Sequence, residues 1–421
     1  MSAGVAGSYA GYLAQRAFLG EEERERKLKT THAKAGRRIS VELSALRGPA
    51  MKLGQALSLQ TDLVPEEILR ELSTLQMHAP GMHPSLVRAQ FKASMGRPPE
   101  DVFRSFENEP FAAASLGQVH RAVTREGKRV AVKIQYPGIR AAIAGDFKLV
   151  RKLAGTARLT GHVPAAVVDE TERQIMAEID YQREADNIDF FRARLGPLSY
   201  VTVPVVYREY SSDRVLTMSL LGGEHLETYL GRQPSQQERD QLGAHLFELF
   251  QYQLLQVGAF HADPHWGNYL FGTKGTVALV DFGCVKYMPP RFVENMHALF
   301  LYSGDRRSVE FRRLREERHP LHGTKMKQAA LRALVNLTDG FYRRVYPPER
   351  EKENEPFDFG EEAFLHDYMR EAGQLFRAKG TRPEYVFMAR AEVGLYQTLH
   401  RLRSRVQTSK IVRKFLRRPR A

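Results

Sequence analysis

Two groupings of polar side chains in one short stretch, HADPHWGNYLFGTKGTVALVDFG, could do chemistry. His261, Asp263 and His265 stand at every second position, a spacing that can place several metal-binding groups on one side of an extended segment. Asp263, Asn268 and Asp281 form the second grouping, which suits the transfer of a phosphoryl group with the help of Mg²⁺. The two interpretations require different partners elsewhere in the chain.

Phosphoryl transfer needs a lysine on the phosphates, a metal held between them and a carboxylate near the acceptor. The segment VAVK ends a predicted strand with Lys133, whose fixed backbone can aim the amine at phosphate oxygens. Asp263 and Asn268 are five residues apart, so one loop can present a carboxylate and an amide oxygen. Asp281 follows a predicted buried strand and precedes a glycine, as a metal carboxylate would. Each motif alone is common; their order makes the pattern specific.

The metal-site interpretation of His261, Asp263 and His265 has less support. Pro264 and Gly267 disfavour a regular strand through these positions, and no distant Cys or His cluster offers further ligands. We expect His261 instead to pack and to form hydrogen bonds within its loop, holding Asp263 in place.

The elements that must position these residues belong to a chain of 421 residues, 43% hydrophobic and 27% charged. This balance is typical of a globular protein with a large core. No apolar run approaches the length of a membrane span, and the first residues make a poor signal peptide, so neither membrane integration nor secretion is expected. The single cysteine, Cys284, excludes an internal disulfide and a multi-cysteine zinc site, and we expect it to be a buried thiol.

The net charge of +14 is concentrated at the end of the sequence. The last 21 residues, RLRSRVQTSKIVRKFLRRPRA, carry nine Lys or Arg and no acid, which leaves +5 for the rest. Ile411, Val412, Phe415 and Leu416 lie between the cations, so this tail could rest on acidic lipid. A solvated basic end is an equal alternative. Nucleic acid ranks behind both, because no aromatic-rich binding module accompanies the tail.

Hydrophobic spacing divides the chain into helical and mixed regions. Residues 21–77 are predicted to be helical, with a new helix from Pro49 and another from Pro65. From about residue 110, KRVAVKIQY, YVTVPVVY and RVLTMSLL are predicted strands. An apolar helical stripe then runs to Val257 and ends at Gly258, and TVALVD follows as a short strand buried on both sides. Beyond residue 290 the pattern is helical again, interrupted by a predicted loop, YPPEREKENEPFDFG.

With these residues in order, the chain resembles the protein-kinase-like superfamily, and three further motifs are similar to those of the UbiB family of atypical kinases, also called AarF. MKLGQALSLQTDLVPEEIL contains its K-x-G-Q signature at Lys52 and Gln55. AAASLGQVHRA, from Ala112, matches its alanine-rich loop, and EIDYQREADN matches its E-x-D signature with the helix glutamate Glu184. The similarity covers about residues 38–300. No ordinary protein kinase has the N-terminal signature, and the usual A-P-E motif is missing here.

The resemblance implies a role for each residue of the phosphoryl-transfer pattern. Lys133 would pair with Glu184, Asp263 would be the catalytic-loop carboxylate, and Asn268 and Asp281 would hold Mg²⁺. A lysine needs a fixed anion to stay extended, and a glutamate on a helix behind the strand provides one. The implied cofactors are ATP and Mg²⁺.

The alanine-rich loop is implied to contact the nucleotide. The residues concerned are Ala112, Ala113, Ala114, Ser115 and Gly117. Each alanine adds a Cβ where ordinary kinases have glycine, so the backbone approaches phosphate less freely and the nucleotide should take a different pose. An alternative, compatible with the first, is that AAAS begins a helix, because alanine is the best helix former.

The K-x-G-Q signature is implied to regulate access to the site. Lys52 and Gln55 are three residues apart on a predicted helix and share a face. By the family pattern this face covers the active site, with Lys52 directed at Glu178 or Asp180. Taken alone, KLGQ would be a solvated helix face. One departure from the family is Trp266, where proline is more usual.

The expected fold is α+β: a bilobal protein-kinase-like fold with an N-terminal helical extension over the active-site cleft and a helical C-terminal lobe. The expected divisions are an N-terminal segment (1–37), the helical extension with the K-x-G-Q motif (38–100), a kinase-like N-lobe with the alanine-rich loop (101–222), a kinase-like C-lobe (223–400) and a basic tail (401–421).

The expected function is that of an atypical kinase or ATPase which binds Mg²⁺–ATP and supports ubiquinone or other isoprenoid-lipid metabolism at a membrane surface. The expected partners are an adenine nucleotide and an anionic or isoprenoid lipid, in the cytoplasm or against the inner face of the membrane. Two alternatives stay open. A small-molecule phosphotransferase of the aminoglycoside or choline kinase type would share the H-x-D-x-x-x-x-N loop but not the K-x-G-Q motif, and a nucleotide-dependent scaffold would bind without turnover.

Overall fold

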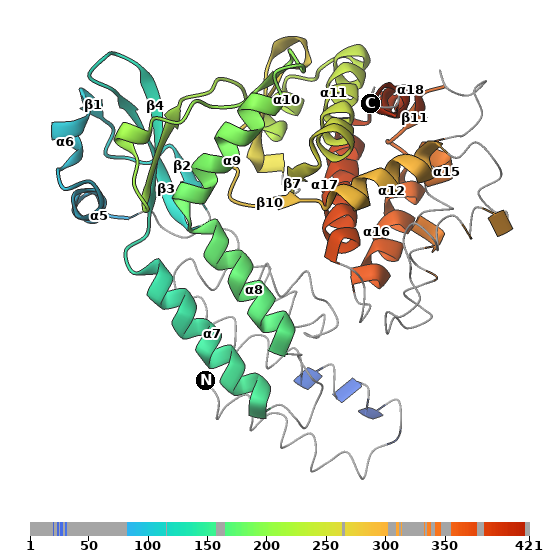
Figure 1. Cartoon of the computed structure of the whole chain (residues 1–421), viewed down its shortest axis with the longest axis horizontal. Helices are drawn as coiled ribbons and strands as arrows, with labels where there is room; N and C mark the ends of the chain where they lie inside the picture. The colour runs from blue at the N-terminus through green and yellow to red at the C-terminus, as the bar shows by residue number, and fades with distance from the viewer. Residues whose placement is uncertain are drawn as a thin grey trace. The chain divides into compact units, whose positions relative to one another are not determined.

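The computed structural model describes most of the chain from residue 82 onward (Figure 1). The described ranges are 82–114, 116–156, 165–262, 266–301, 355–376 and 383–416, with scattered residues between 20 and 31 and between 309 and 346. The helices predicted within 38–77, the K-x-G-Q motif with Lys52 and Gln55, and the site residues Ser115 and Asp263 lie outside these ranges.

The chain divides into two compact units. The first runs to Arg183 and includes Val206–Leu220; the second comprises Glu184–Val205 and the chain from Leu221 onward. Both helices and sheets are present, so the predicted α+β class is confirmed. The domain boundaries expected from the sequence stay predictions.

The first unit contains an antiparallel sheet of five strands. These are β1 (Ser105–Phe106), β2 (Ala112–Ala114), β3 (Gly117–Val123), β4 (Arg129–Gln135) and β6 (Val215–Ser219). The order is β1-β3-β4-β6, and β2 also pairs with β3. The strands predicted in KRVAVKIQY and RVLTMSLL are therefore confirmed. The helix predicted as an alternative for AAAS is wrong, because its three alanines pair with β3 instead.

Among the described residues of this unit, the sheet is accompanied by the helices α5 (Pro84–Met95), α6 (Pro99–Val102), α7 (Ile139–Thr156) and α8 (Ala165–Glu178). Phe91 of α5 is fully buried and belongs to one core with the β-branched side chains of β4, among them Val130 and Val132. The helices α7 and α8 lie side by side (Figure 1), and Ile143 and Ile175 are buried in a second cluster. The first of these cores packs on β4, which lies between β3 and β6 in the sheet.

The described residues of the second unit form three small sheets. The strands are β5 (Val201–Thr202), β7 (Ala259–His261), β8 (Tyr269–Phe271), β9 (Val277–Leu279), β10 (Val285–Tyr287), β11 (Phe357–Asp358) and β12 (Arg405–Val406). They pair as β5-β9-β8, β7-β10 and β11-β12. All of β9 is buried, which confirms the strand predicted in TVALVD. YVTVPVVY forms only the short β5, and β11 lies where a loop was predicted, so these two predictions were partly wrong.

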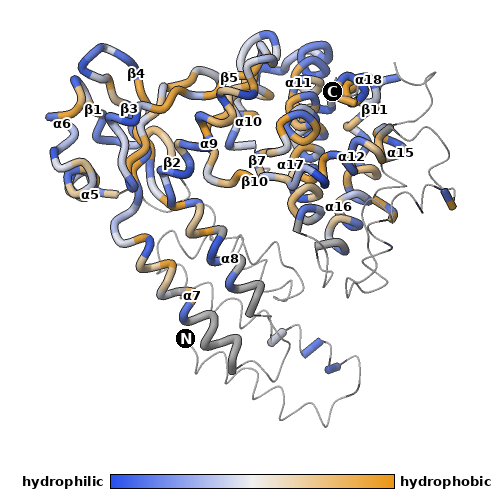
Figure 2. The backbone as a smooth tube through the Cα atoms, in the orientation of Figure 1, coloured by the Kyte–Doolittle hydropathy of each residue, from blue (hydrophilic) through white to orange (hydrophobic). Residues whose placement is uncertain are grey.

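The helix α9 (Tyr181–Arg194) crosses the boundary between the units. Further helices in the described part of the second unit are α10 (Leu226–Gly231), α11 (Gln236–Tyr252), α12 (Pro290–Leu301), α15 (Tyr342–Val345), α16 (Glu362–Phe376), α17 (Pro383–Leu402) and α18 (Thr408–Phe415). Bands of hydrophobic and hydrophilic residues alternate along α11 (Figure 2). A Ser235–Glu238 capping box starts α11. A π-helical turn extends it to Val257, and Gly258, at φ 68°, ends it as predicted.

The basic tail contains the helix α18. Its apolar residues Ile411 and Val412, with the following Leu416, are buried, and α18 packs against α11. Phe415 meets the ring of Tyr252 edge-on, with 5.5 Å between ring centroids. The apolar side of the tail therefore packs within its own unit, and any contact with lipid would depend on its cations.

Candidate active site

In the first unit, Lys133 lies on the central strand β4 between Val119 of β3 and Leu216 of β6. Its residue is only 6% exposed, and Nζ lies 5.1 Å from the ring centroid of Tyr181. A buried ammonium group is costly without compensating contacts, and the aromatic face of Tyr181 is one such contact. Lys133 thus lies on a strand, as the VAVK motif predicted.

Gly117 begins β3 opposite Ala114 of β2 and Gln135 of β4. A Cβ built on Gly117 would lie 2.3 Å from the carbonyl oxygen of Ile134 and 3.0 Å from the hydroxyl of Tyr181. No side chain fits there without moving backbone. Gly117 therefore allows β3 and β4 to approach closely, independently of any contact with a ligand.

A chain of buried hydrogen bonds runs beneath the same hairpin. The Nδ1 of His120 lies 2.8 Å from the carbonyl oxygen of Glu107, and its Nε2 lies 2.8 Å from the side-chain nitrogen of Gln118. The side-chain oxygen of Gln118 accepts the backbone N–H of Met82 at 2.7 Å. One neutral tautomer satisfies all three contacts, with the proton on Nδ1. Burial lowers the pKa of the His120 imidazole, opposed by the Glu107 carbonyl and by the charges of Glu109 and Glu107.

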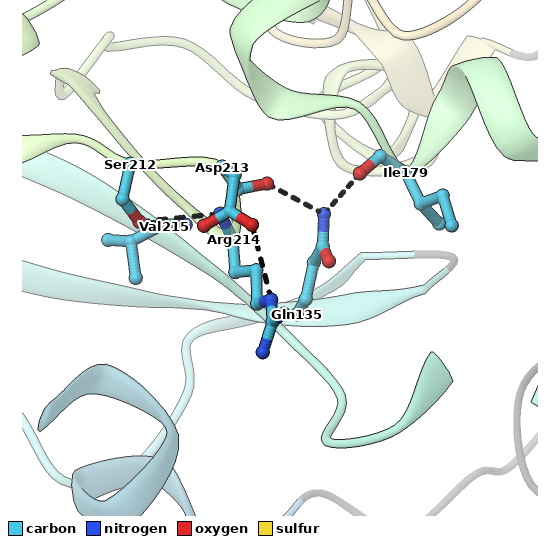
Figure 3. Close-up of polar contacts among 6 residues, drawn as sticks. All are labelled: Gln135, Ile179, Ser212, Asp213, Arg214 and Val215. Carbon is cyan, nitrogen blue, oxygen red and sulfur yellow. Dashed lines mark hydrogen bonds and ion pairs between the residues drawn. The ribbon is translucent and has the colours of Figure 1, made fainter. Parts of the chain in front are cut away.

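Gln135, at the end of β4, joins two loops (Figure 3). Its side-chain amide donates to the carbonyl of Ile179 and, at 3.4 Å, to that of Asp213. The hydroxyl of Ser212 accepts the N–H of Val215 at 3.2 Å and so secures the loop that precedes β6. Neither Gln135 nor His120 was predicted as a site residue. In the sequence Gln135 is only a polar residue at the end of a largely apolar strand, and His120 lies within AAASLGQVHRA without a role of its own.

The two acidic residues of the E-x-D signature occupy a helix junction. Glu178 ends α8, and the Oδ1 of Asp180 accepts the N–H of Arg183 at 3.1 Å, in the first turn of α9. Asp180 thus caps α9, a role that Asp commonly takes. The expected contact of either residue with Lys52 lies outside the described residues.

In the second unit, side chains of α9 hold the backbone of the Asp-Phe-Gly turn. Buried Glu184 accepts the N–H of Phe282 at 3.3 Å, and buried Asn187 donates to the carbonyl of Phe282 at 2.8 Å. The hydroxyl of Tyr287 donates to the Asn187 carbonyl oxygen at 2.7 Å. Both backbone groups of Phe282 are therefore paired. Asn187 was not predicted as a site residue, although its position three residues after Glu184 puts both on one helix face.

The β8–β9 hairpin brings Asn268 and Asp281 to the same end. The carbonyl of Asn268 accepts the N–H of Val280 at 3.1 Å, and Asp281 is the next residue. The Asp281 Oδ1 accepts the N–H of Gly283 at 2.9 Å, which orients the carboxylate. An amide and a carboxylate oxygen are ligands that Mg²⁺ accepts, so the residues present fit this ion.

His261 lies buried on β7 and supports the same turn. Its Nε2 lies 2.6 Å from the carbonyl oxygen of Asp281, to which it donates, and its N–H donates to the side chain of Gln253 at 3.3 Å. It thus holds Asp281; the expected contact with Asp263 lies outside the described residues.

Within the described residues, no cluster of three or more His, Cys, Asp or Glu could hold a metal. Asp263 and His265, which belong to the predicted alternative metal site, lie outside the described residues.

Cys284 follows the turn and is half-buried. The prediction of a buried thiol was therefore wrong. Its carbonyl accepts the N–H of Ala262 at 2.8 Å, next to the paired strands β7 and β10.

No helix among the residues described is long and apolar enough to cross a bilayer.

The site residues thus fall into two groups. Lys133, Gly117 and the three alanines lie in the first unit, and Glu184, Asn268 and Asp281 lie in the second. The ion pair expected between Lys133 and Glu184 would join the two units and stays a prediction, as do the ligand contacts of every residue named.

Comparison with known proteins gives one matching family. The family described as "ABC1 atypical kinase-like domain" matches residues 74–311, more than half of the chain. An uncharacterized aarF domain-containing chloroplastic kinase of Arabidopsis thaliana is 40% identical over 256 residues, covering 59% of this chain and 35% of the relative. The mitochondrial atypical kinase coq-8 of Caenorhabditis elegans is 33% identical over 282 residues, covering 65% of this chain and 37% of the relative.

The chain therefore spans about a third of the length of these curated relatives. A solved structure matches over a greater share. The complex of Rv3197 with erythromycin from Mycobacterium tuberculosis has a TM-score of 0.64 at 25% identity and covers 94% of this chain and 98% of that one.

Proposed function

The chain belongs to the ABC1 family of atypical kinase-like proteins, also called UbiB or AarF, and from this premise we propose that it binds Mg²⁺–ATP and hydrolyses or transfers the γ-phosphoryl group. Family membership supports kinase-type activity in general. It also confirms the kinase-like fold and the family resemblance predicted from the motifs.

The observation that carries the proposal is the support given to the Asp-Phe-Gly turn. Glu184 and Asn187 hold both backbone groups of Phe282, and His261 holds the carbonyl of Asp281. A short turn with three such supports keeps its carboxylate in one orientation, which metal binding requires. Asn268, at the same end of the hairpin, supplies a second oxygen. These two residues would hold Mg²⁺, which would neutralise charge on the phosphates.

Lys133 and the alanine strand support the nucleotide half of the proposal. A lysine fixed on β4 can act as a phosphate ligand, with Glu184 as the anion that keeps it extended. The strand β2 presents alanines rather than glycines and is already paired with β3, so its backbone is less free to wrap around phosphates. We therefore expect a nucleotide pose that differs from that of ordinary protein kinases.

The acceptor is water or a lipid-like molecule in this proposal. The family resemblance implies ubiquinone or other isoprenoid-lipid metabolism at a membrane surface, in the cytoplasm against the inner face of the membrane. The curated relatives described above are a chloroplastic and a mitochondrial protein, so the compartment proposed for this chain rests on the resemblance and not on theirs.

The test is ATP binding and turnover by the purified full chain, with Mg²⁺, anionic liposomes and isoprenoid-like phenols. Asp281→Asn should abolish Mg²⁺-dependent turnover and weaken nucleotide binding only when Mg²⁺ is present. Lys133→Met should weaken binding with or without the metal. Asp101→Asn, which removes an exposed carboxylate from α6, is the matched control and should change neither.

Each result distinguishes the proposal from its alternatives. Nucleotide binding without turnover under every condition would favour the scaffold. A phosphorylated small alcohol among the products would favour a small-molecule phosphotransferase. No nucleotide binding at all would overturn the proposal.

A further inference from the structure

The second unit has a cavity of about 530 Å³ formed by α11, β12 and α18. None of the predicted site residues lines it. Its charged and titratable lining consists of Asp240, His245, Glu248, Arg405, Lys410 and Lys414. The volume falls in the range of small-molecule sites, roughly 300 to 1,000 Å³. The helix α18 and the strand β12 lie beyond the matched family region, which ends at residue 311.

The walls of this cavity are held by packing and by backbone contacts. Ile411 of α18 is buried against the unit, and the strand β12 pairs with β11, where Arg405 lies opposite Asp358. The N–H of Arg405 donates to Asp240 of α11 at 2.7 Å. The cavity is therefore formed before any ligand arrives, which lowers the entropic cost of binding.

Both acidic residues of the lining are already engaged within the chain. The Oδ1 of Asp240 accepts from Arg405 and, at 2.7 Å, from the side-chain amide of Gln236. Glu248 accepts the hydroxyl of Tyr200 at 3.1 Å and forms an ion pair with Lys414 at 3.0 Å. Glu248 is therefore paired with a cation, whereas Asp240 accepts only from neutral donors and keeps its negative charge.

Two cations of the lining have no such partner. The side chains of Arg405 and Lys410 are exposed and form no ion pair or hydrogen bond within the described part of the chain. With Lys414, they give the lining three cations against the carboxylates of Asp240 and Glu248, so the formal charge of these five side chains is +1. A net positive charge at the lining favours the binding of anions.

We propose that this cavity binds the phosphate group of a phosphate ester. A guanidinium group pairs with two phosphate oxygens at once, and an ammonium group adds a compact charge. The cavity is larger than a phosphate ion needs. His245 also lines it, with Nδ1 held 2.7 Å from the carbonyl oxygen of Gly275, and its Nε2 can form a hydrogen bond to the alcohol part of an ester. The phosphate ester is either a soluble metabolite or the head group of a phospholipid.

The first arm of the test uses a soluble ester. The full chain is titrated with glycerol 3-phosphate by calorimetry, with Mg²⁺–ADP present throughout so that any nucleotide site is occupied. The double variant Arg405→Gln/Lys410→Gln should weaken binding by about tenfold or more, since removing one charge-assisted hydrogen bond costs about that factor. Ala244→Leu, which fills the cavity without changing charge, should weaken it as well.

The second arm uses lipid. Sedimentation with vesicles of phosphatidylglycerol and phosphatidylcholine is compared with sedimentation with vesicles of phosphatidylcholine alone. A head-group site predicts binding to the anionic vesicles that both variants lose. A soluble-ester site predicts that both variants lose the binding of glycerol 3-phosphate but sediment with the anionic vesicles as the parent does.

The matched control is Lys92→Gln/Arg97→Gln, which removes two exposed cations from the first unit. It should bind as the parent does in both arms. Equal losses in the control and in the cavity double variant would show that net charge alone is measured and would overturn the proposal. Absence of binding to both ligands would overturn it too. Unchanged melting temperatures establish that the variants fold.

Discussion

The two units hold their halves of the candidate site by different means. In the first unit, Lys133 is one residue of a seven-residue central strand with neighbours on both sides. In the second, Asp281 lies in a turn whose backbone is held by the side chains of Glu184, Asn187 and His261. A continuous ladder of backbone hydrogen bonds positions the amine, and three separate side chains position the carboxylate.

This difference determines where each half is vulnerable. A ladder distributes its support over many residues, so only a change that separates the strands should disturb Lys133. A turn held by individual side chains loses much of its support with any one of them. Substitutions near Lys133 should therefore act mainly on stability, and substitutions around Asp281 should act on metal binding as well.

The largest effect should come from Gly117→Ala. The added Cβ would lie 2.3 Å from the carbonyl oxygen of Ile134, which is backbone and cannot move aside cheaply. We expect a loss of about 3 kcal/mol or more in unfolding free energy, measured by urea denaturation. Hydrogen exchange should rise across β2, β3 and β4. The control is Gly145→Ala in α7, where a Cβ meets nothing within 4 Å and alanine should be neutral or stabilising by about 1 kcal/mol.

If hydrogen exchange in Gly117→Ala rose as much in β8 and β9 as in β2, β3 and β4, the comparison would be contradicted. Such a result would show that both halves of the candidate site belong to one cooperative unit. If Gly117→Ala and Gly145→Ala had equal free energies of unfolding, β3 and β4 would accommodate the added Cβ without a loss of stability.

The strands that carry these halves were predictable where local pattern decides structure. Val130, Val132 and Ile134 are β-branched and all buried, so the strand that carries Lys133 followed from composition. The alanines of β2 were ambiguous, because helix propensity competes with a strand that only its partner β3 specifies. YVTVPVVY looked like a strand by composition but has a proline and only a two-residue partner in β9. Tertiary pairing, which a local pattern does not contain, made the difference.

The second prediction concerns Asn187→Ala. This change leaves the buried carbonyl of Phe282 without its donor and removes the acceptor of the Tyr287 hydroxyl. We expect a loss of about 2 kcal/mol in unfolding free energy. Mg²⁺-dependent nucleotide binding should fall further than stability explains, because the turn that orients Asp281 is loosened. The control is Gln182→Ala, an exposed position on the same helix. Nucleotide binding that stayed at the parent's level would show that the turn does not need this support.

The roles of the motif residues were predictable only in part. The order of Lys133, Asn268 and Asp281 in the sequence pointed to the chemistry. Asn187 and His120 lie within motifs that assigned them no role, and their roles follow from their hydrogen bonds. Glu184 was expected to face Lys133, and the contact observed in its own unit is with the backbone of Phe282. Motifs identify chemistry, whereas the side chains that orient it are specified by the fold around them.

The third prediction uses the buried histidine beneath the hairpin of the first unit. Burial lowers the pKa of His120 in the folded state, so as the pH falls through the ordinary value of 6.5 the unfolded chain takes up a proton first. Stability should therefore decrease below that pH, by up to about 1.4 kcal/mol per pH unit from this group. In His120→Gln the urea midpoint should depend less on pH between 5 and 7. Parallel pH profiles for the parent and the variant would contradict a neutral, buried imidazole.

The smallest effect should come from Asp180→Ala, which removes the cap of the helix that carries Glu184 and Asn187. The Oδ1 of Asp180 accepts the N–H of Arg183, and the loss of such a cap costs about 1 kcal/mol. Asp180→Asn keeps an acceptor and should recover most of that stability, which separates capping from charge. If α9 is the support of the turn, fraying its first turn should also raise hydrogen exchange at Phe282, by less than Asn187→Ala does. Exchange at Phe282 that did not change in Asp180→Ala would mean that the later turns of α9 hold the Asp-Phe-Gly backbone by themselves.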